Sequence, residues 1–240
     1  MQKYIKIFVC FAMLVFLFAC SANGENAETV YLVENSEENV ICVAYPKLPL
    51  PEREAANHEI EDFVQEKIAE ICLLTDYNLS ASTKKLSETT ADYQNTYLSM
   101  DYRITYCTED LISIVFEGLY HYKKAAHPMH LLFTLNMNPA SGNRLAFADR
   151  YAIDENLYEI FAAQAETDIS ESAGGTWPKE WGTFSETICG KSDFLTGLAA
   201  EKDFHVFYTT EGVGISYPVP YSMGDHSEVT LPYTALTPAS

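Results

Sequence analysis

The chain has 240 residues, of which 48% are hydrophobic, so it is long enough for one sizeable domain or two small ones and has the composition of a folded protein. Its 15 basic residues stand against 34 acidic ones, a formal net charge of −19 that argues against nucleic acid or an anionic membrane surface as a binding partner. The same charge favours solubility, and it would also steer a cationic partner toward the protein.

Residues 1–19 predict a signal peptide. MQKYIK supplies two lysines, and an unbroken apolar run follows from Ile7 to Ala19. This run is shorter than the roughly 20 residues of a membrane-spanning helix. Cys20 comes directly after Ala19, which resembles a bacterial lipobox, although Phe18 is bulkier than the usual residue there. We therefore predict cleavage before Cys20 and a lipid on that cysteine; a plain secretory signal or an uncleaved anchor is the alternative.

The mature chain would begin with a short polar tether, residues 20–27. Cleavage would remove Lys3 and Lys6 and no acid, leaving 13 basic and 34 acidic residues and a formal net charge of −21. We expect this chain in the cell envelope, facing away from the cytoplasm and attached to the membrane through its lipid only.

Strand and helix signals alternate in the first half of the body. Residues 28–35 and 39–48 are rich in Val, Ile and Tyr and predict two β segments, the second ended by a proline-rich loop. In residues 52–75 apolar side chains recur at helical spacing opposite a charged face, which predicts an amphipathic helix. Residues 77–95 are polar and indicate no clear element.

Three strands are predicted next, at residues 96–107, 110–122 and 130–137, with short links that favour an antiparallel meander. Apolar residues in the middle strand alternate with period two. One of its faces carries Ile112, Ile114, Phe116, Tyr120 and Tyr122. NPASGN, residues 138–143, predicts a turn.

The last third predicts a second helix at residues 154–170, with Asp154 or a neighbouring residue as the N-cap, and three strands at 204–210, 213–219 and 228–233. Neither a repeat nor a second linker interrupts residues 28–240. We therefore predict a single α+β domain, an antiparallel β-sheet with two main helices packed on one face.

Four cysteines fall in the predicted domain: Cys42, Cys72, Cys107 and Cys189. The absence of a CxxC motif argues against thioredoxin-type and zinc-knuckle sites. In an exported chain these residues could form two disulfides in three possible pairings. Most of them lie in apolar segments, where buried thiols are the simpler interpretation, and the sequence leaves both possibilities open.

The sequence AHPMH places His127 and His130 on either side of Pro128. Proline disfavours a helix here, and on an extended segment a spacing of three points the two rings to opposite faces, so a metal pair is geometrically unfavourable. The motifs GxSxG and HExxH and the glycine-rich nucleotide loops are missing from the sequence. We predict no metal, no cofactor and no catalytic residue. A cell-wall hydrolase or accessory subunit using His127 with a nearby acid is the alternative.

Tyrosine is the most informative aromatic residue, with 16 copies. Tyrosine combines apolar area with a hydroxyl group at low entropic cost, which suits protein interfaces and sugar faces. We expect several to reach the surface, namely Tyr120, Tyr122, Tyr208, Tyr217 and Tyr221. Packing within the sheet is the alternative for each of them.

Three stretches together resemble one bacterial family in the same order. They are YPKLPLPEREAANHEIEDFV (45–64), AHPMHLLFTLNMNPASGNRLAFADRY (126–151) and FHVFYTTEGVGISYPVPYSMGDHSEVTLPYTAL (204–236). Residues 29–236 thereby resemble the RsiV-like extracytoplasmic domain, found in a lysozyme-sensing anti-sigma factor and beside peptidoglycan deacetylases. Ala125 and Ala126 stand where that family has glycines before His-Pro, which puts the tight turn there in question.

The resemblance implies a non-catalytic, lipid-anchored binding domain that recognises a peptidoglycan fragment or a cationic protein, such as the muramidase lysozyme. Because only MQKYIK precedes the apolar run, we expect no sigma-binding region. The candidate ligand-binding residues are Tyr120, Tyr122, His127, Tyr217 and Tyr221. A structural envelope protein without a soluble ligand is a further alternative.

Overall fold

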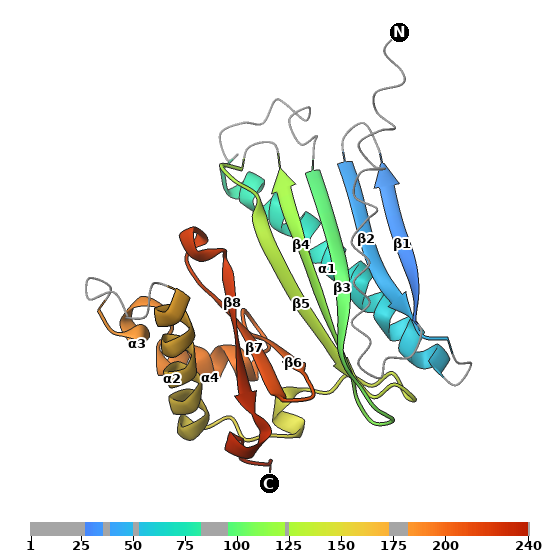
Figure 1. Ribbon diagram of the computed structural model, residues 1–240. Coiled ribbons are helices and arrows are strands. Elements are labelled where there is room, and N and C mark those ends of the chain that lie inside the picture. Colours follow the sequence, from blue (N-terminus) through green and yellow to red (C-terminus); the bar gives the residue numbers. More distant parts are fainter. Residues whose placement is uncertain are drawn as a thin grey trace.

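The computed structural model describes residues 27–35, 39–49, 53–82, 96–122, 125–172 and 182–239 (Figure 1). The predicted signal peptide, Cys20 and all of the tether except Ala27 lie outside these residues. Among the described residues, no helix is long and apolar enough to cross a membrane.

The N-terminal half forms a five-stranded sheet in the order β1-β2-β3-β4-β5. Its elements are β1 (Glu28–Asn35), β2 (Asn39–Lys47), α1 (Glu54–Ser82), β3 (Thr96–Cys107), β4 (Ile112–Tyr122) and β5 (Met129–Met137). All neighbouring pairs are antiparallel except β2 and β3, which run parallel. Parallel neighbours need a long crossover connection, and the segment containing α1 supplies it.

Helix α1 lies across one face of this sheet, as Figure 1 shows. Its apolar stripe, predicted from the helical spacing, buries Ile60 and Phe63 against Ile114 and Phe116 of β4. The rings of Phe63 and Phe116 have centroids 5.5 Å apart. We call this side the inner face and the opposite side the outer face.

The C-terminal half forms a second sheet of three antiparallel strands in the order β6-β7-β8. Its elements are α2 (Glu155–Ser172), α3 (Phe184–Thr187), α4 (Lys191–Ala199), β6 (His205–Tyr208), β7 (Gly212–Pro218) and β8 (His226–Pro232). Asp154 acts as predicted at the start of α2, because its carboxylate accepts a hydrogen bond from the Leu157 amide at 2.9 Å.

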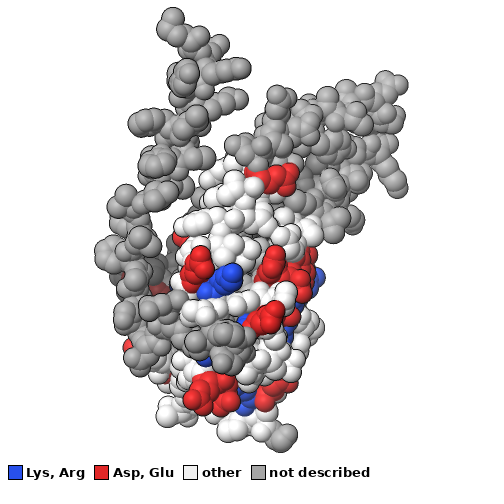
Figure 2. All heavy atoms as spheres, turned by 90° about the vertical axis from the view of Figure 1, so that its right-hand side faces the viewer, with Lys and Arg blue, Asp and Glu red and all other residues white. Residues whose placement is uncertain are grey.

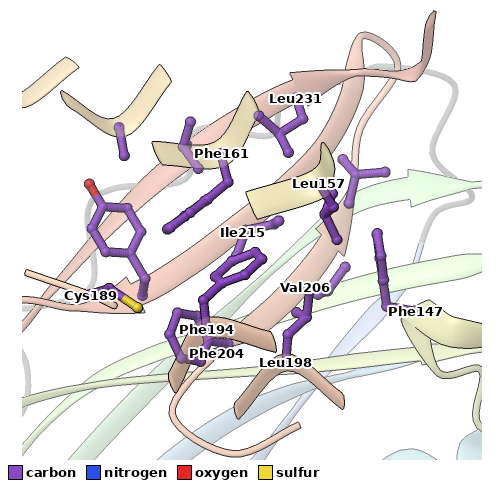
Figure 3. Close-up of a cluster of buried hydrophobic side chains, with 14 of the residues drawn as sticks. Phe147, Leu157, Phe161, Cys189, Phe194, Leu198, Phe204, Val206, Ile215 and Leu231 are labelled. Atoms are coloured by element: carbon purple, nitrogen blue, oxygen red, sulfur yellow. The ribbon is translucent and has the colours of Figure 1, made fainter. Parts of the chain in front are cut away.

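Aromatic side chains fill the space between this sheet and its helices (Figure 3). Phe161 of α2 is completely buried at the centre. Its ring stacks on Phe194 of α4 with centroids 4.3 Å apart and meets the ring of Tyr217 edge-on at 5.1 Å. Contacts of this kind add to the hydrophobic gain from burial.

The two sheets meet where β6 lies against the outer face of β4 and β5. Phe207 of β6 packs on Val115 and Leu132 there. Ser113 of β4 is fully buried and its hydroxyl accepts a hydrogen bond from the Tyr208 amide at 2.9 Å. The Asn136 amide group donates to the Val206 carbonyl at 2.7 Å, so β5 is also tied to β6 at its edge.

The predicted fold class is confirmed: the protein is α+β, with mostly antiparallel strands and helices packed on them. Three features are new. The strands divide into two sheets, β2 and β3 pair in parallel, and the short helices α3 and α4 occupy a region where we predicted no element. Strand β2 also continues through Pro46, whose pairing partner is Thr29.

Candidate functional site

The structure corrects the expected exposure of three tyrosines. Tyr120 is 4% exposed, Tyr217 is fully buried and Tyr208 is 1% exposed. Tyr120 shares the inner face with Ile114 and Phe116, so it packs in the core with α1. Tyr217 and Tyr208 face the helices of the second sheet. Tyr120 and Tyr217 therefore present no surface to a ligand.

Tyr122 lies at the end of β4 and is half-buried. Its ring centroid is 6.1 Å from that of Tyr120, so part of its apolar area is used inside the protein. Two of the predicted residues, His127 and Tyr221, are brought together by the fold, and Tyr221 is 50% exposed.

His127 stands in the β4–β5 connection and Tyr221 in the β7–β8 connection, and their rings stack. The centroids are 3.4 Å apart and the ring planes are inclined by 19°. The His127 Nδ1 atom is 3.0 Å from the Pro128 carbonyl oxygen. Since a stacked ring loses rotational freedom before any partner arrives, Tyr221 is a preorganised aromatic contact.

Local hydrogen bonds hold each of the two connections. The Ala125 amide donates to the Tyr122 carbonyl at 2.8 Å, so a hydrogen bond closes this turn with alanine at position 125. In the other connection Gly224 has φ 107° and its amide donates to the Tyr221 carbonyl at 3.0 Å. A glycine is favoured at that backbone conformation.

Asp225 links the two connections. Its carboxylate accepts a hydrogen bond from the backbone amide of His130, at 2.9 Å. Asp225 itself has φ 70°, a conformation that Asn and Asp adopt more readily than most residues. We name the surface formed by His127, His130, Tyr221 and Asp225 the rim. It couples the two sheets and exposes one aromatic ring.

Sequence reasoning missed Asp225 as part of this site. The glycine before it predicts a turn, but its hydrogen bond reaches a strand far away in the sequence. The His127 ring stacks on the Tyr221 ring, and its Nδ1 atom lies beside the Pro128 carbonyl oxygen. In the part of the chain that the structure describes, no group of three or more His, Cys, Asp or Glu side chains is arranged to hold a metal ion.

A shallow cleft of about 100 Å³ lies elsewhere, between α1, β5 and β6. Its two basic residues already have partners. Lys67 is bonded to Glu70 at 2.9 Å, and Arg144 is bonded to Glu59 and to Glu66. Arg144 holds the pKa of the Glu66 carboxyl below its ordinary value through this hydrogen bond. A ligand anion would have to displace these carboxylates.

His205 lines the same cleft and is poorly suited to acid–base work at neutral pH. Burial, together with the nearby positive charge of Lys67, lowers the pKa of His205 to about 4. Its ring meets Phe133 edge-on with centroids 5.7 Å apart. The arrangement is that of a neutral core histidine.

Cys189 is a buried thiol, 6% exposed, and burial raises its pKa to about 11. A thiol in this state is a poor nucleophile. The buried-thiol interpretation rests on the apolar segments around Cys42, Cys72 and Cys107, so the burial of Cys189 is a finding of the structure. The side chain of Cys72 lies outside the described residues, and the choice between disulfides and thiols for Cys42, Cys72 and Cys107 stays a prediction.

Several basic side chains already interact with other groups of the same chain. Lys67, Arg103, Arg144 and Lys191 form ion pairs with carboxylates, and the Arg150 guanidinium lies 5.7 Å from the centre of the Tyr208 ring. Figure 2 shows that acidic residues are spread over the side that carries β1, whereas basic residues are few there. The field at this face is therefore mainly negative.

The architecture has counterparts among solved structures. A DUF3298 family protein from Bacteroides fragilis superposes with a TM-score of 0.50 at 13% identity, covering 87% of this chain and 90% of that one. A second DUF3298 family protein, from Pseudomonas aeruginosa, gives a TM-score of 0.49 at 14% identity, covering 88% and 92%. No protein-family model and no curated protein matches the sequence. At this identity the likeness establishes the fold alone, and the fold is that of DUF3298 proteins.

Proposed function

We propose that the protein is a lipid-anchored extracytoplasmic binding domain without catalytic activity, which uses the rim to recognise a cationic cell-wall-related protein such as a lysozyme-type muramidase. The observation that carries the proposal is the rim itself, where the fold stacks the half-exposed ring of Tyr221 on His127. Fixed, partly exposed aromatic rings are common anchors in protein interfaces.

Charge supports the choice of a cationic partner. The mature chain would carry −21, and the ion pairs described above pair four of its 13 basic side chains with its own acids. A negative field accelerates the encounter with a basic protein, an effect that salt suppresses. The resemblance to the RsiV-like domain points to the same partner class.

The geometry around His127 favours binding over hydrolysis. In the Ser-His-Asp type of hydrolase a carboxylate orients the histidine base and stabilises its protonated form. Here the carboxylate of the rim, Asp225, is bonded to the His130 backbone, and one face of the His127 ring is covered by Tyr221.

Interferometry with the chain from residue 21 and immobilised lysozyme tests the proposal, at about 50 mM and about 500 mM salt. We expect binding at low salt that weakens at least about tenfold at high salt. Tyr221→Ala should weaken binding by about tenfold or more, and His127→Ala by less, because it removes only the support of that ring.

Matched controls are available on other surfaces. Tyr31→Ala removes a tyrosine that is more exposed than Tyr221 but lies on β1, and His58→Ala removes an exposed histidine of α1. Neither should alter lysozyme binding. Unchanged binding by Tyr221→Ala would reject the rim, and no binding at low salt would reject the muramidase as partner. Peptidoglycan turnover that disappears in His127→Ala would support the hydrolase instead.

A further inference from the structure

The two edge strands of the five-stranded sheet, β5 and β1, differ in how many contacts they make with other parts of the protein. At β5 the His130 amide is capped by Asp225 and the Asn136 side chain bridges to β6. At the other edge β1 pairs with β2 only, and no other described strand lies beside it. An edge strand offers a row of amide and carbonyl groups to any chain that can pair with it.

β1 lacks the usual protection of an exposed edge. Its sequence, ETVYLVEN, contains neither proline nor lysine, and β1 is eight residues long without an irregularity in its pairing with β2. Proteins commonly place prolines, lysines or bulges on such strands to prevent pairing with other chains. Tyr31 and Val33 are instead both 65% exposed.

These two side chains begin a larger apolar surface on the outer face. The register places Val33 beside Cys42, Ser99 and Leu119 in one row across the sheet, and Val40 beside Tyr97 in the next. We name as the outer patch the exposed members Tyr31, Val33, Val40, Tyr97 and Leu119. The second sheet covers the outer face around Ser113, Val115 and Leu132, and it also contacts Arg103. A contiguous exposed apolar surface of this kind usually marks an interaction site.

Charge identifies the class of partner. Exposed Glu28 and Glu34 stand near the two ends of β1. If two copies of β1 paired antiparallel about Tyr31, each Glu28 would face the Glu34 of the other copy, and like charges opposite one another destabilise a strand pair. Two chains of this net charge would also repel each other. A partner strand with lysine or arginine opposite Glu28 and Glu34 would instead form favourable charge pairs at both ends of β1.

We propose that β1 and the outer patch form a docking site for an extended basic segment of a partner polypeptide, which adds to the sheet as a sixth strand next to β1. Main-chain hydrogen bonds would supply affinity, alternate apolar side chains would lie on the outer patch, and basic side chains would meet Glu28 and Glu34. The site is separate from the rim, so it does not depend on the muramidase proposal.

A synthetic seven-residue peptide with the sequence Lys-Val-Thr-Val-Thr-Val-Lys tests the site, by fluorescence anisotropy with the chain from residue 21. Its two lysines are six residues apart, as Glu28 and Glu34 are, and its valines lie on the other face of the strand. Binding is expected. Methylation of alternate backbone nitrogens on the pairing side should abolish it, because methylation removes the donors but keeps the charge. Exchange of both lysines for glutamate should weaken binding at least about tenfold.

A charge-swap variant gives the decisive comparison. E28K/E34K should lose about tenfold for the lysine peptide and gain about as much for the glutamate peptide, since both positions are exposed. E166K/E171K changes the same charge on the exposed side of α2 and should leave the preference unchanged.

Three results would overturn the proposal. They are binding of the N-methylated peptide with undiminished affinity, an equal effect of the α2 control variant, and a stable dimer of the free chain in sedimentation velocity that E28K/E34K alters. The last result would assign the same surface to a second copy of this protein.

Discussion

The two sheets of this molecule differ in how much of their surface they hide. The three-stranded sheet is covered by α2, α3 and α4 on one face, while Phe207 on its other face packs against the larger sheet. The five-stranded sheet is covered by α1 on its inner face, but much of its outer face and the edge at β1 are open. Each half therefore has a buried core of its own, and the open apolar surface lies on the five-stranded sheet.

The largest expected effect comes from truncating the centre of the aromatic core. Phe161→Ala should lower the free energy of unfolding by about 3–5 kcal/mol, because it empties a fully buried site that contacts rings from α4 and β7. Urea unfolding measures the change. Tyr97→Ala, an aromatic truncation on the outer patch, serves as the control and should cost far less. Equal costs would contradict the contrast between the two sheets.

The half-buried histidine in the cleft, His205, provides the next test. The folded-state pKa of His205 is about 4, below its unfolded value, so the unfolded chain binds a proton first as the pH falls. The contribution of His205 to the free energy of unfolding is fully present above about pH 6.5 and is lost progressively toward pH 4. Between pH 7 and pH 5 we expect a loss of about 2 kcal/mol.

His205→Gln isolates this contribution, because glutamine does not titrate. Urea unfolding of the variant at pH 7 and pH 5 should show a smaller pH dependence than the wild-type chain, although the variant has lost the ring contact with Phe133 at both pH values. An identical pH dependence in the two proteins would show that folding does not lower the pKa of His205.

A smaller effect is expected from the ion pair that joins the sheets. The Arg103 guanidinium is 3.0 Å from Glu228 on β8 and 2.6 Å from Glu117 on β4, and it lies 4.9 Å from the centre of the Phe207 ring. Arg103 is 40% exposed, so solvent screens the pair. A double-mutant cycle of Arg103→Met and Glu228→Gln should give a coupling of about 0.5 kcal/mol, lower still in 1 M salt.

The sequence predicted much of this fold because its elements have strong local periodicity. The strand at residues 96–107 and the helix that begins at Glu155 are recovered almost residue for residue. The parallel pairing of β2 with β3 and the division into two sheets depend on which distant strands meet, and no local pattern records that. Helices α3 and α4 are too short to show a clear period.

The candidate site was recovered only in part, for a related reason. The stack of His127 on Tyr221 joins two turns that are distant in the sequence, and the role of Asp225 depends on the same approach. The burial of Tyr120 could have been predicted from the sequence, because the period-two alternation of the strand places it on the same face as Ile114 and Phe116. An aromatic residue that shares a face with such neighbours belongs to the core rather than to a binding surface.

The smallest effect on stability is expected where the surface is most apolar. Tyr31 and Val33 are each 65% exposed and bury little of their area in the folded chain. Replacing them together, as Tyr31→Thr and Val33→Thr, keeps residues that favour strands and should change the free energy of unfolding by less than about 0.5 kcal/mol. Binding of the lysine peptide should nevertheless fall sharply, because the apolar contact is lost while Glu28 and Glu34 remain. A large loss of stability in this double variant would mean that these side chains are already covered within the protein, and the open edge at β1 could then not serve as a docking site.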